Sequence, residues 1–245
     1  MEFVFQLAVA LLASFIQTVT GFGFALVMIP TMVAVTDAKS AVILTLALYM
    51  VVGSGISWNA RKDIDRPLLT TLLLSSFFGL PLGAYVLVVI SDTLLRLLIG
   101  IFIIAASLLL LFDYQRPFSS ERKAAVVVGF LGGAINSCVT VCGPFVVLFL
   151  ANQGLPKERL RATIAAFLLG ITPPTLAILY FGGLVTDQLL GTALQLLPIC
   201  VVGYLLGLWF LPRVNSQLFR RSMVVLVLFA GSSIFLSELR LLAGV

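Results

Sequence analysis

Two short polar, glycine-containing stretches interrupt long apolar segments of the chain, at residues 17–24 and 136–144. Each combines hydroxyl or amide side chains with glycine, which lets a backbone approach a ligand closely. We take both stretches as candidate binding segments. The candidate residues are Gln17, Thr18, Thr20, Gly21, Phe22 and Gly23 in the first, and Asn136, Ser137, Cys138, Thr140, Cys142 and Gly143 in the second.

The chemistry that these stretches favour is anion binding. A helix that restarts after each break, near Gly23 and near Gly143, presents unpaired N–H groups and the positive end of its dipole. Such a helix end binds anions readily, and the amides of Gln17 and Asn136 add donors. Glycine and threonine are also common packing residues in membrane helices. The matching positions of the two breaks favour a binding site over packing alone.

Catalysis is not expected from this sequence. The chain contains no histidine, and no Asp, Glu, Lys or Arg lies deep within an apolar segment. Cys138 and Cys142 are close in sequence, but no neighbouring group would activate them as nucleophiles. We therefore predict no enzyme activity, no cofactor and no metal site. The missing internal carboxylate also argues against a dedicated proton relay.

The composition indicates a polytopic α-helical membrane protein. Of the 245 residues, 61% are hydrophobic and 10% are charged, whereas soluble domains have about 45–50% and about 25%. The net charge of +5 is attributed to cytoplasmic loops rather than to nucleic-acid binding. The N-terminus lacks a basic region, so no cleaved signal peptide is expected.

The two interrupted segments are predicted to be re-entrant hairpins. Residues 3–36 would form a helix of about 50 Å, which is too long for one crossing of a core about 30 Å thick. The break leaves arms of about 15 residues, each short for a full crossing. Residues 124–153 have the same pattern. Full spans are expected at 41–60, 68–90, 94–113, 162–181, 188–211 and 222–239, giving about eight segments in total.

The order of segments predicts an internal repeat. We divide the chain into a first repeat at 1–113, a linker at 114–123 and a second repeat at 124–245. An offset of 120 aligns Gly143 with Gly23, and an offset of 124 aligns Gly203 with Gly79 and Gly207 with Gly83. Weak internal symmetry of this kind is common among secondary transporters.

Loop charge sets the expected orientation. Cytoplasmic loops are enriched in Lys and Arg, and two of the basic loops flank residues 124–153. That segment would therefore enter and leave on one side. Each repeat then has one hairpin and three crossings, so the repeats are inverted, the hairpin tips meet near the midplane, and both termini lie outside. The alternative is that each broken segment crosses fully, which gives parallel repeats. The basic residues of the four loops are Arg61, Lys62 and Arg66; Arg116, Arg122 and Lys123; Lys157, Arg159 and Arg161; and Arg213, Arg220 and Arg221.

These features together predict a secondary transporter of a small anion that works by alternating access. Prolines within spans are expected to act as hinges: Pro81, Pro173, Pro174 and Pro198. The Thr172–Thr175 kink either completes the site or serves as a hinge. Two alternatives stay open, an anion channel with the same site and a membrane accessory or assembly protein without transport. The coupling ion (H⁺ or Na⁺), the direction of transport and the oligomeric state are left open.

The run from Gly21 to Pro30 resembles the signature that opens the first half of TauE/SafE sulfite-exporter proteins. The run from Gly129 to Pro144, followed by Gly154-Leu155-Pro156, resembles the partner signature of that family. The resemblance covers nearly the whole chain. It implies a multi-pass permease of the bacterial inner membrane for small anions, often sulfur-containing, such as sulfite, sulfonates, or sulfoacetate-like and thiosulfate-like compounds. One departure is the stretch from Cys138 to Cys142, where the family is often richer in glycine.

Overall fold

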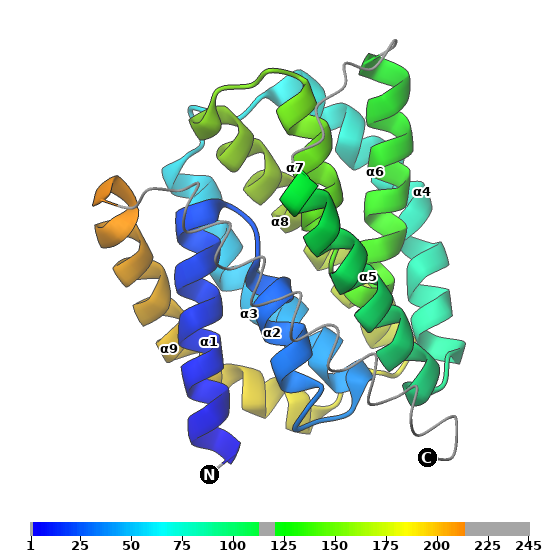
Figure 1. The fold of residues 1–245 in the computed structure, drawn as a ribbon. Coiled ribbons are helices and arrows are strands. Elements are labelled where there is room, and N and C mark those ends of the chain that lie inside the picture. Colours follow the sequence, from blue (N-terminus) through cyan, green and yellow to red (C-terminus); the bar gives the residue numbers. More distant parts are fainter. Residues whose placement is uncertain (1, 113–120, 214–245) are drawn as a thin grey trace.

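The computed structural model describes residues 2–112 and 121–213, and within these ranges every regular element is a helix (Figure 1). The predicted last span at 222–239, Arg220 and most of the predicted linker lie outside the described residues. The elements are α1 (Glu2–Thr20), α2 (Phe24–Met32), α3 (Ala38–Asn59), α4 (Arg66–Val89), α5 (Asp92–Phe112), α6 (Glu121–Val139), α7 (Gly143–Asn152), α8 (Lys157–Phe181), α9 (Asp187–Phe210) and a short 3₁₀ turn, η1 (Leu211–Arg213).

The described helices confirm a polytopic membrane protein. Seven of them, α1, α3, α4, α5, α6, α8 and α9, are long and apolar enough to cross a membrane. Side-chain caps define several of their starts. Asp37 accepts a hydrogen bond from the Ser40 N–H at the start of α3, and Asp65 accepts one from the Leu68 N–H at the start of α4. Short polar loops therefore separate consecutive apolar helices.

Each broken segment forms a hairpin. In Figure 1, α1 rises from the N-terminus and α2 returns toward the same end of the molecule. Helices α6 and α7 do the same from the opposite end: α6 descends and α7 rises again. Neither described segment therefore runs straight through the molecule. That each hairpin is re-entrant in the membrane stays a prediction.

The arms of the hairpins are unequal, which corrects the predicted arms of about 15 residues. Helices α1 and α6 each have 19 residues, whereas α2 has 9 and α7 has 10. The polar residues that were expected to break the first helix stay helical, because Thr18 and Thr20 donate to carbonyls of the preceding turn. The break thus shortens to residues 21–23 in the first hairpin and 140–142 in the second.

Basic residues gather at one end of the described structure. The loop between α3 and α4, the start of α6, the loop between α7 and α8 and the end of α9 all lie toward the upper end in Figure 1. The starts of α3 and α5, whose first residues include Lys39 and Arg96, lie toward the lower end. Under the positive-inside rule the upper end would be the cytoplasmic one, and this orientation stays a prediction.

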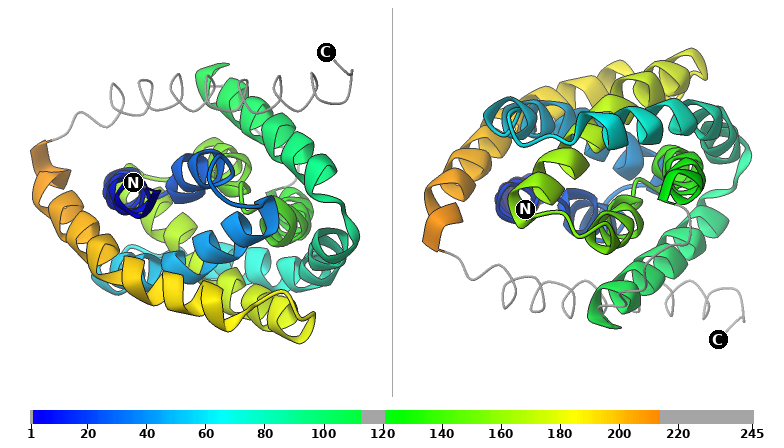
Figure 2. Two further views of the ribbon diagram at one scale, coloured as in Figure 1. Left: turned by 90° about the horizontal axis from the view of Figure 1, so that it is seen from below. Right: turned by 90° about the horizontal axis from the view of Figure 1, so that it is seen from above.

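Glycines bring two pairs of helices into close contact. A β-carbon built on Gly79 or Gly83 of α4 would lie 2.0 Å from a carbonyl oxygen of α6. A β-carbon on Gly203 of α9 would lie 2.5 Å from the Leu11 carbonyl oxygen of α1. Each pair joins a helix of one half to the hairpin of the other. Seen along the helices in Figure 2, α1 and α2 lie near the centre, with α5 and α9 on the outside.

The four proposed hinge prolines all lie inside continuous helices. Pro81 is within α4, Pro173 and Pro174 are within α8, and Pro198 is within α9. Each removes one N–H donor from its helix. Their role as hinges stays a prediction.

Candidate functional site

The two hairpin tips touch in the interior of the molecule. A β-carbon built on Gly143 would lie 3.5 Å from the Cβ atom of Phe22. A cavity lies beside this contact, and the middle parts of α3 and α8 complete its wall. Its lining residues are Gln17, Gly23, Phe24, Ala25, Leu26, Thr45, Leu46, Tyr49, Asn136, Thr140, Val141, Gly143, Pro144, Leu168 and Thr172.

Gln17 organises the first break. Its Nε2 atom donates to the Gly21 carbonyl oxygen at 2.9 Å, and its Oε1 atom accepts from the Phe24 N–H at 2.9 Å. The side chain thereby links the end of α1 to the first residue of α2. Gly21 and Gly23 have φ angles of 85° and 110°, a region that favours glycine. This part of the tip is therefore shaped by its own side-chain and backbone bonds.

Thr20 and Thr18 serve the first hairpin in different ways. The Thr20 hydroxyl donates to the Ile16 carbonyl at 2.9 Å and also contacts the Phe22 carbonyl. The Thr18 hydroxyl donates to the Ser14 carbonyl at 2.8 Å. Its Cβ atom lies against Gly207 of α9. Thr18, Thr20, Gly21 and Phe22 therefore do not line the cavity, whereas Gln17 and Gly23 do.

The second break is built without glycine at its left-handed position. Thr140 has a φ angle of 61°, which is unusual for a β-branched residue. Its backbone N–H donates to the Asn136 carbonyl at 3.0 Å, which ends α6. The Cys142 thiol donates to the Asn136 Oδ1 atom at 3.5 Å and so joins the two ends of the break.

Two buried polar atoms at the cavity make no hydrogen bond to the described part of the protein. The Asn136 Nδ2 atom and the Thr140 Oγ1 atom are both buried, and neither has a hydrogen-bond partner within residues 2–112 and 121–213. Asn136 is 2% exposed and Thr140 is 7% exposed. A buried donor without a partner costs about 1–3 kcal/mol. Their position in the cavity wall points to a ligand that accepts hydrogen bonds.

The starts of α2 and α7 add backbone donors to the same space. The N–H groups of Ala25, Leu26 and Gly143 make no hydrogen bond to any described residue, and all three residues line the cavity. By contrast, Val27 donates to the Gly23 carbonyl at 3.2 Å and Val146 to the Cys142 carbonyl at 3.3 Å. Two helix N-termini therefore face one cavity.

The cavity is neutral and small. None of its lining residues within the described ranges is Asp, Glu, Lys or Arg. Its water-accessible volume is about 30 Å³, enough for about two water molecules. An oxyanion of four or five heavy atoms would enter only if the walls moved apart.

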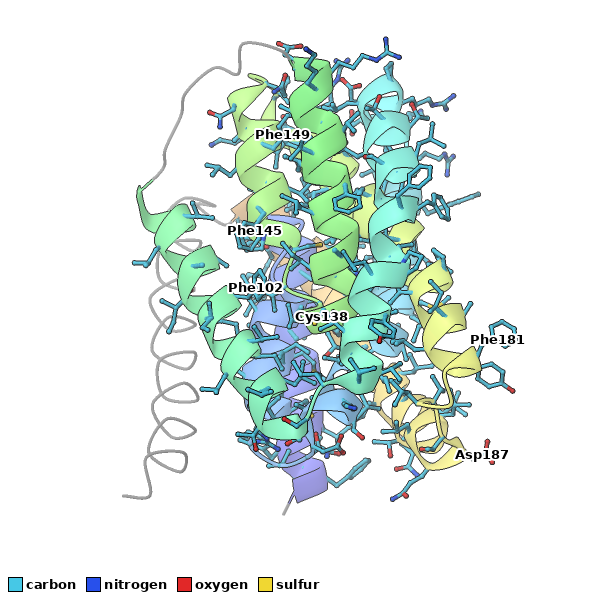
Figure 3. The ribbon with its side chains drawn as sticks, turned by 90° about the vertical axis from the view of Figure 1, so that its right-hand side faces the viewer. Phe102, Cys138, Phe145, Phe149, Phe181 and Asp187 are labelled. Carbon is cyan, nitrogen blue, oxygen red and sulfur yellow. The ribbon has the colours of Figure 1, made fainter. Side chains whose placement is uncertain are left out.

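Ser137 and Cys138 lie next to the tip rather than in the cavity wall. Ser137 Oγ lies 3.4 Å from Thr175 Oγ1, which joins α6 to α8. Figure 3 shows Cys138 near the lower end of α6, with Phe145 and Phe149 above it along α7. Phe145 packs edge-on against Phe102 of α5, with 6.1 Å between ring centroids. These contacts hold the second hairpin against α5 and α8.

Ten wall residues were not among the sequence candidates, and five of these come from α3 and α8: Thr45, Leu46, Tyr49, Leu168 and Thr172. Thr45 and Tyr49 lie four residues apart, so they share one face of α3. The Tyr49 hydroxyl donates to the Ala165 carbonyl at 3.1 Å, which ties α3 to α8. Thr172 begins the proline-containing kink, where completing a site was one of the two interpretations.

Arg161 of α8 lies behind the first tip. A β-carbon on Gly21 would lie 2.6 Å from its Cγ atom. Its Nε atom is buried and finds no hydrogen-bond partner in the part of the chain that the structure describes. Arg161 does not line the cavity. No group of three or more potential metal ligands occurs among the described residues.

Seven apolar helices that are long enough to cross a membrane, with two hairpins that meet at a buried cavity, define a polytopic membrane protein among the described residues. The family model for Sulfite exporter TauE/SafE matches residues 6–234. The chain therefore belongs to the TauE/SafE sulfite exporter family, as its motifs suggested. No curated protein and no solved structure matches it. Because this is a family of membrane transporters, the chain is a multi-pass transporter of sulfur-containing anions and not an enzyme.

Proposed function

We propose that this protein is a secondary transporter that binds a small sulfur oxyanion, such as sulfite or a sulfonate, in the cavity between its hairpin tips. It moves the anion across the bacterial inner membrane by alternating access. The observation that carries the proposal is the pair of buried, unpartnered donors, Asn136 Nδ2 and Thr140 Oγ1, in a cavity at two helix starts. Oxyanion oxygens accept hydrogen bonds from such groups.

The binding mode follows from the donors around the cavity. Asn136 and Thr140 come from the second hairpin, and the N–H groups of Ala25 and Leu26 come from the first. An anion held by both sets would bridge the tips. It would also lie on the positive ends of the α2 and α7 dipoles. The oxyanion thus replaces its hydration shell with donors that are fixed in place.

Alternating access is supported by the small size of the cavity and by the opposite directions of the hairpins (Figure 1). We propose that the halves are inverted repeats, and that rocking of one against the other opens the cavity to one end at a time. Helices α4, α8 and α9, with their internal prolines, would accommodate the movement. A channel would need a continuous path, so its flux would rise with concentration without saturating.

The first experiment is thermal unfolding of the detergent-purified protein with sulfite, thiosulfate, methanesulfonate or chloride. A ligand at 100 times its Kd stabilises by about 2.7 kcal/mol. We expect at least one sulfur anion to raise the unfolding temperature, and chloride to raise it less. Saturable counterflow in proteoliposomes with the same anion then tests transport.

A matched pair of variants locates the site. Thr140→Val removes the unpartnered hydroxyl and keeps the side-chain shape, so we expect the sulfur anion to stabilise it less. Thr18→Val makes the same change on the other hairpin, outside the cavity, and should respond as the wild type does. If the sulfur anion stabilised Thr140→Val as much as the wild type, the cavity would not be the binding site. No response of the wild type to any of the sulfur anions would contradict the proposed binding of these anions in the cavity.

A further inference from the structure

We propose that the cavity selects singly charged anions over doubly charged ones, so that sulfite is carried as hydrogensulfite and brings its own proton. This inference rests on the proposed function, because it concerns the same site. It names the charge of the substrate and the source of the coupled proton. It depends on the donors that line the cavity and on the position of the charged side chains around it.

The donors at the cavity are all neutral. They are the Asn136 amide, the Thr140 hydroxyl and the backbone N–H groups of Ala25, Leu26 and Gly143. Moving an ion from water into a low-dielectric interior costs several kcal/mol even after relaxation. In a continuum description that cost grows with the square of the charge. Neutral donors and two helix dipoles that offset one charge therefore leave the second charge of a dianion uncompensated.

The described cations do not change this balance. Arg161 packs against the first hairpin tip, where its Cγ atom would lie 2.6 Å from a β-carbon built on Gly21. Lys39 and Arg96 are engaged at the lower end, where Lys39 donates to the Val88 carbonyl and Arg96 pairs with Asp92. None of these side chains lines the cavity.

The titratable groups of the protein at the cavity hold their protons in hydrogen bonds. The Tyr49 hydroxyl, which comes from α3, donates to Ala165. The Cys142 thiol, at the start of α7, donates to Asn136. No carboxylate from any described element lines the cavity. A proton that crosses with the anion is therefore best carried by the anion.

Hydrogensulfite satisfies that requirement with balanced chemistry. HSO₃⁻ and SO₃²⁻ differ by one proton and interconvert near neutral pH. Binding HSO₃⁻ takes one proton and one negative charge into the cavity. On release, the anion equilibrates with water and gives the proton up on the other side. One proton therefore crosses with each sulfite although no residue in the wall titrates.

The first test compares two ligands of the same size and shape. Methanesulfonate carries one charge and sulfate carries two, and both are tetrahedral at sulfur. We expect thermal-shift titrations of the wild-type protein, at constant ionic strength, to give an apparent Kd at least about tenfold higher for sulfate. Equal or tighter binding of sulfate would overturn charge selection and leave the proposed anion site standing.

The second test follows the sulfite titration as a function of pH. Above the second ionisation of sulfurous acid, the apparent Kd for total sulfite should rise about tenfold per pH unit, because the protonated form becomes scarce. The apparent Kd for methanesulfonate should stay constant over the same range, which controls for titration of Tyr49, Cys142 and Arg161. A sulfite Kd that does not rise would overturn proton carriage. If no sulfur anion stabilises the protein at any pH, the proposed function itself fails.

Discussion

The two hairpins look alike in sequence, but they satisfy their polar groups in opposite ways. In the first hairpin, Gln17 bonds both sides of the break, and glycines take the left-handed positions. In the second, Thr140 takes the left-handed position, and Asn136 and Thr140 keep unused donors. The two tips are therefore expected to have different roles in ligand binding. The first tip is a self-supported scaffold that offers backbone N–H groups, and the second offers side chains to the ligand.

The hairpins also differ in how the other half of the molecule holds them. Both helices at the α4–α6 contact supply glycines: Gly79 and Gly83 from α4, and Gly129 and Gly133 from α6. At the α1–α9 contact, the glycines are on α9 and face Ser14 and Thr18 of α1. Close approach of backbones strengthens van der Waals packing between membrane helices. The second hairpin is therefore packed more closely against the other half than the first.

The largest expected effect tests this difference in packing. A β-carbon on Gly83 would lie 2.0 Å from the Ala134 carbonyl oxygen, whereas one on Gly207 would lie 2.5 Å from the Thr18 Cβ atom. Overpacking costs about 1–3 kcal/mol, and more where backbone must move. We expect Gly83→Ala to lose at least about 3 kcal/mol and Gly207→Ala to lose less. Thermal unfolding in detergent measures both.

Gly191→Ala provides the control for that pair. Nothing lies within 4 Å of a β-carbon at Gly191 of α9. Replacing an unhindered helical glycine with alanine stabilises by about 0.5–1 kcal/mol. If Gly207→Ala lost as much stability as Gly83→Ala, the two hairpins would be held equally tightly.

An intermediate effect is expected from substituting the two amide residues, Gln17 and Asn136, and it distinguishes a structural residue from a ligand-binding one. Gln17→Met leaves the Gly21 carbonyl and the Phe24 N–H without their bonds to Gln17, and each unmet buried group costs about 1–3 kcal/mol. Asn136→Leu removes a donor that was already unpaired and a weak thiol bond. We therefore expect Gln17→Met to lower the unfolding temperature and Asn136→Leu to leave it near the wild-type value. Asn136→Leu should instead lose the stabilisation by sulfur anions.

The reverse outcome would refute this division of roles. If Asn136→Leu unfolded several degrees early while Gln17→Met did not, Asn136 would be the structural residue and Gln17 the available donor. Measuring both variants with and without methanesulfonate distinguishes the two assignments, because stability and ligand response are read in the same experiment.

Much of the fold could be predicted from patterns in the amino-acid sequence. Apolar length, the polar breaks at residues 17–24 and 136–144, and the basic loops predicted helices, hairpins and the grouping of basic loops at one end. The lengths of the hairpin arms could not be predicted from these patterns. Threonine can end a helix or remain in it by bonding a carbonyl of the preceding turn, and Thr18 and Thr20 do the latter.

The site was harder to predict, because a donor can bind a ligand only if it does not already donate a hydrogen bond within the protein. Gln17 and Asn136 are both amides beside a break, and sequence assigned them the same role. Only the geometry shows that Gln17 is bonded twice within its hairpin while the Asn136 Nδ2 atom has no described partner. Tyr49 reaches the cavity because α3 packs against α8, a contact that no local pattern encodes.

The smallest expected effect comes from substituting a residue with a positive φ angle in each hairpin tip. Thr140 has a φ angle of 61° and Gly23 one of 110°. A left-handed conformation costs a non-glycine residue about 1–2 kcal/mol, so Thr140→Gly should relieve that strain, offset in part by the added entropy of glycine in the unfolded chain. Gly23→Ala should lose about 1–2 kcal/mol, because the φ angle of 110° at this position disfavours any residue with a β-carbon. Thermal unfolding without ligand should therefore show a small gain for Thr140→Gly and a loss for Gly23→Ala. A clear loss in Thr140→Gly would show that the Thr140 side chain stabilises the second tip, which would then be a scaffold like the first.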